Sequence, residues 1–287
     1  AALGREPTLI SGLVSCAVGH ITVDAATRFM AQAGNLTNDE LSVLQQAFSS
    51  SAESLSLRTG YIGEVAMQQD AYDRILRGDI SALGVFVGAG DASPAVRTAW
   101  VKSIAWLIRG PIKSDRAACL ETMLQIVAAA GNPTPSNVAD SYWRGQIPEP
   151  TIFPPTFRSI FLPSLGRGTQ QGEILRAKLR AAGACCAAAR YRNDTGKWPE
   201  SLDALVPQYL DKLPMDPFTG VELLYRLDAD GAMVYSIGPN RKDEVGRPGL
   251  QIRPKNIYTQ IWDSYDDAGF RIWEEASDAD SPQGGSK

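Results

Sequence analysis

The chain has 287 residues, of which 44% are hydrophobic and 21% charged, which is ordinary for a globular protein of one or two domains with a sizeable core. Its formal net charge of −4 and the absence of a Lys/Arg cluster argue against nucleic-acid binding. We find no signal peptide and no apolar run near the ~20 residues of a membrane span, because Gly12, Gly19, His20 and Asp24 interrupt the longest candidates.

The first half of the chain, residues 1–147, has the pattern of an all-helical array. A helix is predicted over about 8–33, because apolar residues recur there at three- and four-residue spacing. Its expected buried face consists of Leu9, Ile10, Leu13, Val14, Ala17, Val18 and Ile21.

The next helices are marked by start and stop signals. Thr37 and Glu40 have the spacing of a capping box and predict a short helix, and a further helical pattern covers about 51–77. Beyond a Gly-rich loop over 78–92, Ser93-Pro94 is a helix start. Gly110-Pro111 is expected to break the chain before another helix that opens at Ser114-Asp115.

The second half begins with a proline-rich connector, placed at 148–168. A long helix is predicted over about 169–193, followed by a left-handed cap at Gly196 and a short helix that opens at Pro199. A hairpin of 223–227 with 232–237 follows.

These elements predict an α+β fold, in which the helical array precedes a long helix and a small antiparallel hairpin or sheet. The α+β domain is placed at 169–275. The last residues, 276–287, are rich in Asp, Ser and Gly and are expected to be disordered.

Three motifs in the second half resemble the globular part of the major pseudopilin of type II secretion systems. They are Tyr191-Arg-Asn-Asp-Thr-Gly-Lys-Trp-Pro, Leu213-Pro-Met-Asp-Pro-Phe-Thr-Gly and Val234-Tyr-Ser-Ile-Gly. The resemblance covers roughly 188–245. It implies a pseudopilin-like module, which is an element of assembly and scaffolding rather than an enzyme.

A looser resemblance extends over residues 3–275. The segments Arg5-Glu-Pro-Thr-Leu-Ile-Ser-Gly-Leu-Val and Leu36-Thr-Asn-Asp-Glu-Leu, together with the pseudopilin-like part, are similar to a group of bacterial proteins abundant in Planctomycetes. In that group a membrane anchor usually precedes the same region. The resemblance therefore implies an anchor N-terminal to this chain and an extracytoplasmic, envelope-associated location.

Groups for catalysis are sparse. His20 is the only histidine and lies on or beside the apolar stripe of the first predicted helix, and no G-x-S-x-G elbow accompanies it. The glycine-rich stretch that begins at Gly84 lacks the Walker lysine and the G-x-G-x-x-G spacing, so no nucleotide cofactor is expected. We therefore expect no enzyme activity.

The four cysteines have no C-x-x-C spacing. Cys185 and Cys186 lie on an Ala-rich helix and are expected to behave as small hydrophobic residues. A bridge between Cys16 and Cys119 is an open alternative in an oxidising compartment.

One acidic loop is a candidate calcium site. The resembled pseudopilins carry calcium in the loop after the corresponding strand, and here that loop holds Asn240 and Asp243. Asp266 and Asp267 could add ligands if the downstream segment folds back, since calcium takes six to eight oxygens. The basic stretch 247–255 separates the two halves, which leaves ordinary solvated turns as the alternative.

Aromatic residues crowd the last third of the chain. Most are expected to pack the hairpin onto the long helix. Tyr258, Trp262 and Trp273 would mark a protein interface if they lie outside that core.

The sequence thus predicts a non-catalytic structural or interaction subunit that binds a protein partner or itself. An enzyme or enzyme accessory with its site between the two domains is one alternative. A peptide- or small-ligand-binding module is the other.

Overall fold

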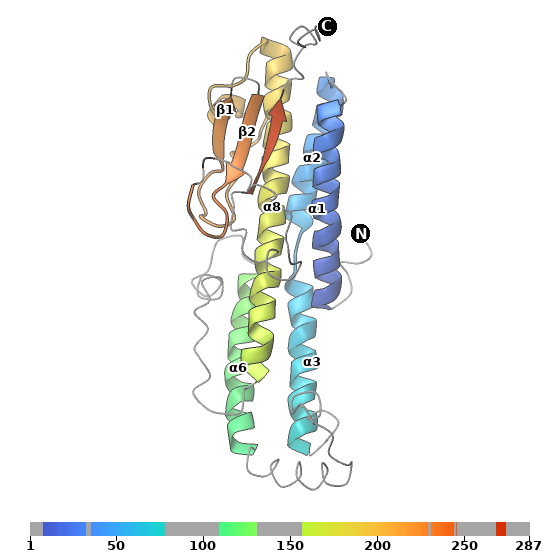
Figure 1. The fold of residues 1–287 in the computed structure, drawn as a ribbon, viewed down its shortest axis with the longest axis vertical. Helices are drawn as coiled ribbons and strands as arrows, with labels where there is room; N and C mark the ends of the chain where they lie inside the picture. The colour runs from blue at the N-terminus through green and yellow to red at the C-terminus, as the bar shows by residue number, and fades with distance from the viewer. Residues whose placement is uncertain are drawn as a thin grey trace, which may run out of the picture. The chain divides into compact units, whose positions relative to one another are not determined.

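The computed structural model describes residues 8–32, 36–77, 109–130, 157–228, 231–243, 245 and 268–273. Their fold is α+β, with long helices and a small antiparallel sheet (Figure 1). The chain forms two compact units. Unit 1 comprises Ala1–Ser15, Ser56–Asn132 and Ser136–Thr169, and unit 2 comprises Cys16–Leu55, Pro133–Pro135 and Gln170–Lys287. This division differs from the predicted boundary at 148–168, because each unit combines segments from both halves of the sequence.

The first predicted helix is confirmed as α1, Leu9–Gln32. The capping box is confirmed as well, at the start of α2, Asn38–Ser54. Thr37 Oγ1 accepts a hydrogen bond from the Glu40 N–H at 3.4 Å, and Glu40 Oε2 accepts one from the Thr37 N–H at 2.9 Å. These two bonds satisfy donors that the first turn of a helix leaves without backbone partners.

The predicted helix over 51–77 is two elements. The last turn of α2 extends to Ser54, and α3 then runs over Arg58–Arg77. The break falls at 55–57, where Leu55 has extended backbone angles. The prediction failed here because the apolar spacing continues across the break.

In unit 1, α3 packs against α6, Arg109–Ala129. The Tyr72 hydroxyl donates to Asp115 Oδ2 at 2.6 Å, and the buried Cys119 thiol donates to Gln68 Oε1 at 3.3 Å. The predicted break at Gly110-Pro111 is wrong, because both residues lie in the first turn of α6. Proline is tolerated there, since the N–H groups of a first turn have no partner within the helix.

The long helix α8 spans Phe157–Thr195, so the predicted start near 169 is wrong. Residues 157–168, assigned above to the connector, are helical, and Pro163 is accommodated at the cost of one helical hydrogen bond. Every residue from 181 to 189 is buried. Small side chains dominate this stretch, and they let neighbouring elements approach the helix closely.

Two elements of unit 2 cover that buried stretch of α8. A Cβ atom added at Gly183 would lie 3.3 Å from Ser49 Oγ of α2 and 3.9 Å from Phe48 Cβ. The sheet lies along the C-terminal half of α8 (Figure 1), and the Cys185 thiol is hydrogen-bonded to the backbone of Val234. The core of unit 2 is therefore built around α8.

The end of α8 agrees with the sequence. Gly196 has φ +76°, and its N–H donates to the Arg192 carbonyl at 2.7 Å, as expected for a left-handed cap. The following short helix is only the 3₁₀ turn η2, Leu202–Leu205, so it does not open at Pro199. Trp198 folds back on α8, with the Arg192 guanidinium 5.0 Å from its ring centre.

The predicted hairpin is confirmed as β1, Leu224–Asp228, and β2, Gly231–Ser236. Its ladder extends to the pair Asp228 and Gly231, so the turn is two residues shorter than predicted. A third strand that the sequence did not predict, β3 over Ala268–Trp273, pairs antiparallel with β2. The order β1-β2-β3 makes β2, all of whose residues are buried, the central strand.

Several predicted segments lie outside the described residues. They are the loop over 78–92, the helix opened by Ser93-Pro94, the first part of the connector and the tail over 276–287.

Candidate functional site

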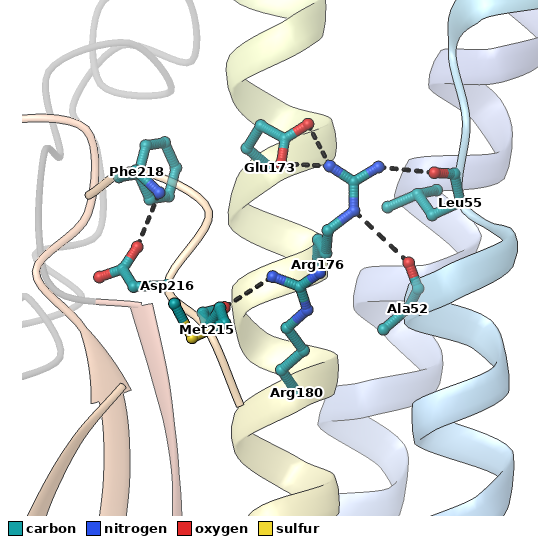
Figure 2. Close-up of polar contacts among 8 residues, drawn as sticks. All are labelled: Ala52, Leu55, Glu173, Arg176, Arg180, Met215, Asp216 and Phe218. Atoms are coloured by element: carbon teal, nitrogen blue, oxygen red, sulfur yellow. Dashed lines mark hydrogen bonds and ion pairs between the residues drawn. The ribbon is translucent and has the colours of Figure 1, made fainter. Parts of the chain in front are cut away.

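Polar groups on α8 are used to hold neighbouring elements of unit 2. Figure 2 shows Arg176 reaching from α8 toward the C-terminal end of α2. Its guanidinium donates to the carbonyls of Leu55 at 2.6 Å and Ala52 at 3.4 Å, and also pairs with Glu173. The last carbonyls of a helix lack backbone partners, so a guanidinium satisfies them and complements the negative end of the helix dipole.

One turn further along α8, Arg180 serves the turn that precedes the sheet. It donates to the Met215 carbonyl at 2.6 Å (Figure 2). Burial and, to a lesser extent, the nearby Arg176 lower the pKa of Arg180 from its ordinary value. Arg180 is only partly buried, and its hydrogen bond and acidic neighbours favour the charged form.

Asp216 organises the same turn. The residue is buried, and its carboxylate accepts hydrogen bonds from the Phe218 N–H at 2.7 Å and the Ile237 N–H at 3.3 Å. Asp216 thereby joins the turn that begins at Pro217 to the residue that follows β2. The aspartate of the Leu213-Pro-Met-Asp-Pro motif therefore has a structural role, since both of its carboxylate oxygens accept hydrogen bonds from backbone N–H groups.

The four thiols are buried and form no disulfide. Burial raises the pKa of Cys16 to about 11, and it also raises the pKa values of Cys185 and Cys186. Neutral thiols of this kind are poor nucleophiles, which agrees with the expectation that the adjacent pair acts as small hydrophobic residues. Cys16 and Cys119 are not bridged to each other.

His20 is half-buried against α8. Burial and then the Lys178 ammonium lower its pKa, while a backbone hydrogen bond with Gln171 and the charge of Asp24 act in the opposite direction. Its Nε2 atom is buried and has no hydrogen-bond partner. The imidazole is therefore held in its neutral form.

Half of the predicted calcium set is described, and its oxygens are engaged within the loop. Asn240 Oδ1 accepts from the Lys242 N–H at 2.8 Å. Asp243 Oδ1 accepts from the Val245 N–H at 2.7 Å and from the Tyr235 hydroxyl at 3.2 Å. Asp266 and Asp267 lie outside the described residues, so the predicted convergence of the four residues stays a prediction.

Within the described ranges, no three His, Cys, Asp or Glu side chains lie close enough together to hold a metal ion.

The predicted aromatic interface falls largely outside the described residues. Tyr258 and Trp262 belong to the undescribed segment 246–267. Trp273 is placed as the last residue of β3, where its backbone pairs with Gly231, and its side chain is not described.

The feature that sequence reasoning missed is the outward side of α1. We define the outer face of α1 as six exposed apolar residues along this helix, and the exposed Ala17 lies at the edge of this face. The six residues are Ile10, Val14, Val18, Ile21, Ala25 and Phe29. The predicted buried face is wrong for five of its seven residues, since Ile10, Val14, Ala17, Val18 and Ile21 are all exposed.

The opposite side of α1 packs inward and combines buried apolar residues, Leu9, Val23 and Met30, with small residues such as Gly12, Cys16 and Gly19. In unit 1, a Cβ atom added at Gly12 would lie 2.8 Å from Leu57 Cδ2. In unit 2, one added at Gly19 would lie 2.5 Å from Leu175 Cδ2, and Cys16 is buried near Arg176. Small residues allow this close approach, and several large apolar side chains are nevertheless exposed on the other side.

This arrangement departs from the usual amphipathic pattern, in which the apolar side of a helix faces the core, because α1 has apolar side chains on both its buried and its exposed side. A signal was present in the sequence, because the stretch 7–23 has no Asp, Glu, Lys or Arg on any side of the helix. A helix without charged side chains on any side is typical of a helix that is covered on all sides.

By length and composition alone, α1 is also apolar enough to cross a membrane. The window Leu9–Ala26 has a mean hydropathy of 1.5, and 22% of it is buried within the structure. Gly12, Gly19, His20 and Asp24 all lie within this window, so these residues do not by themselves exclude a membrane span, contrary to the prediction from the sequence. The core helix of a globular protein or a signal sequence can meet the same criterion, so the finding is weak evidence for a membrane span.

Comparisons of the chain with protein-family models, with curated proteins and with solved structures find no match.

Proposed function

We propose that this chain is a non-catalytic structural or interaction subunit of an envelope-associated, extracytoplasmic assembly. The outer face of α1 carries the proposal. It presents large aliphatic and aromatic side chains to solvent along most of a 24-residue helix. Contiguous exposed apolar patches on globular proteins mark sites of interaction with proteins or membranes.

The hydrogen bonds of the charged side chains in unit 2 also support a structural role. Arg176, Arg180 and Asp216 are hydrogen-bonded to backbone groups of neighbouring elements. General acid–base or nucleophilic catalysis needs a titratable or activated group that can reach a substrate. In unit 2 these groups instead fix turns and helix ends.

The order of elements after residue 169 supports a pseudopilin-like module. A long helix ends at a left-handed glycine, a turn ordered by Asp216 follows, and the chain then forms an antiparallel sheet against that helix. We extend the proposal to include this module as the scaffold that presents α1. The envelope location and an anchor N-terminal to the chain belong to the same proposal.

The experiment is to purify the chain and measure its molecular mass by light scattering, alone and with proteins recovered by cross-linking in the envelope fraction. In parallel, ester, peptide and glycoside substrates are tested for turnover. We expect a defined self-association or a stoichiometric complex, and no turnover. A monomer without a stable partner that turns over one of these substrates would contradict the proposal.

A further inference from the structure

We infer that the outer face of α1 binds the outer face of α1 in a second copy of this chain, with the two helices antiparallel about a two-fold axis. The inference rests on the proposed function and names the partner. It is drawn from the spacing, the sizes and the exposure of the six outer-face residues.

The spacing keeps the outer face on one side of a straight helix. Successive members are four, four, three, four and four residues apart. Eleven residues make slightly more than three complete turns, so Ile10 and Ile21 lie on the same side, as do Val18 and Phe29. Such a repeat supports contact over the whole face without strong supercoiling.

The same spacing reads identically from either end. A two-fold axis between residues 19 and 20 therefore places each outer-face residue opposite an outer-face residue of the second copy. The opposed pairs are Ile10 with Phe29, Val14 with Ala25, and Val18 with Ile21. A two-fold interface requires this kind of self-complementarity, because both copies use the same patch.

Side-chain size and charge favour the antiparallel arrangement over the parallel one. A parallel pair would set Phe29 against Phe29 and Ala25 against Ala25. The two phenylalanines would hold the helix axes apart, whereas the two alanines would leave a gap between the helices. The parallel pair would also bring the two exposed Asp24 carboxylates together. In the antiparallel pair those carboxylates are separated by nine residues along the axis, about 14 Å.

The area of the face suits a dimer. Ile10 is 73% exposed and Ile21 is 68% exposed, and the remaining large members are also exposed. The largest apolar patch of a typical monomer covers roughly 300–600 Å², and a specific interface buries at least about 1,000 Å² on both copies together. A pair of such patches reaches this limit when each covers the other almost completely, as the face-to-face arrangement allows.

The inner side of α1 argues against a bilayer as the occupant. Gly19 is in close contact with Leu175 of α8, and Cys16 is buried near the charges of Arg176 and Glu173. To cross a bilayer, α1 would have to leave these contacts. A partner helix covers only the outer face and leaves them intact.

The test is disulfide trapping in the full chain. In the variant Val14→Cys/Ala25→Cys, the thiol at position 14 of one copy faces the thiol at position 25 of the second copy. Within one copy the two thiols are eleven residues apart, about 16 Å, which is too far for a bond. The four native cysteines are buried and do not compete. We expect mild oxidation to give a covalent dimer with the double variant and not with Val14→Cys or Ala25→Cys alone.

A second measurement uses sedimentation equilibrium. Ile21→Glu places a charge at the centre of the outer face and should weaken self-association about tenfold or more. The matched control is Val43→Glu on α2, because Val43 has the same 68% exposure. Circular dichroism shows whether each variant remains folded, and Val43→Glu should associate like the original chain.

Three outcomes would overturn the inference. Dimers of Val14→Cys alone would show that the helices are parallel. Flotation with phosphatidylcholine vesicles that Ile21→Glu abolishes, without disulfide trapping, would show that a bilayer covers the face. A monomeric mass at all concentrations would exclude the second copy, whereas the proposed function would still stand if a complex with another protein were isolated.

Discussion

The helices α1 and α8 both contain long stretches rich in small and apolar residues, yet the structure treats them differently. In α8 every residue over 181–189 is buried, with α2 and the sheet in contact with the helix. In α1 only 22% of the window Leu9–Ala26 is buried. Both helices have small residues where neighbours approach closely, but α1 also leaves several large apolar side chains exposed, among them Ile10 and Ile21.

The difference teaches that apolar spacing locates a helix without showing which side is covered. Alanine, glycine and cysteine in α8 let two neighbours approach together, which completes the core of unit 2. Glycine and serine in α1 allow one close approach, and the outer face is left for a partner. We expect substitutions in the two helices to separate these roles.

The largest contrast is expected between Leu175→Ala and Ile21→Ala. Leu175 is buried against α1, so its truncation leaves a cavity and should lower the free energy of unfolding by roughly 2–5 kcal/mol. Ile21→Ala should change that free energy by less than about 0.5 kcal/mol in dilute protein, since the side chain is exposed. Urea unfolding measures both. Equal losses would show that the outer face is part of the core.

The second contrast concerns the arginine that joins α8 to α2. Arg176→Met should lower the free energy of unfolding by roughly 2–4 kcal/mol, because Glu173 and the carbonyls of Leu55 and Ala52 lose their donor. The controls are Glu173→Gln and the double variant Glu173→Gln/Arg176→Met. The double variant should lose less free energy of unfolding than Glu173→Gln and Arg176→Met lose in sum, since the two side chains form one network. Additive losses would mean that the pair is not coupled.

A smaller effect is expected at the cap of α8. Trp198 is half-buried, with the Arg192 guanidinium over its ring. Trp198→Ala should therefore lower stability by about 1–2 kcal/mol, less than for a fully buried tryptophan. Thermal unfolding of Trp198→Ala beside Trp198→Phe measures the contribution. An unchanged midpoint in the alanine variant would show that the turn adds nothing to the core.

The smallest effect is a pH dependence of α1 packing. The pKa of His20 is lowered in the folded state, mainly by burial, so the unfolded chain binds the proton more readily. Its contribution is complete above the ordinary histidine pKa of about 6.5 and is lost as the pH falls below that value. We expect His20→Asn to flatten the stability profile between pH 7 and pH 5, measured by urea unfolding. A profile that keeps its slope would assign the effect to the carboxylates.

Much of the fold follows from local chemistry that the sequence displays. The capping box at Thr37 and Glu40, the left-handed Gly196 and the hairpin are confirmed because each depends on a few adjacent residues. The third strand, over Ala268–Trp273, was not predicted because it pairs with β2 across a long interval of sequence. Pro111 and Pro163 misled the prediction, since both lie inside helices.

The outer face could not be predicted because periodicity does not reveal which side of a helix is covered. Val14 and Cys16 are both apolar and lie two positions apart, yet Val14 is exposed and Cys16 is buried. What decides between them is the close approach of α8 at Gly19, a contact between residues far apart in sequence. The contacts of Arg176 with the end of α2 are equally non-local.

The central claim, that α1 is covered by a second copy, predicts that stability depends on protein concentration. Association stabilises the folded state by mass action, so the midpoint of thermal unfolding should rise with concentration. The direct measurement is this midpoint for the original chain, Ile21→Glu and Val43→Glu over a hundredfold range of concentration. The account predicts a rise for the original chain and Val43→Glu and none for Ile21→Glu. Midpoints that are independent of concentration in all three proteins would contradict it.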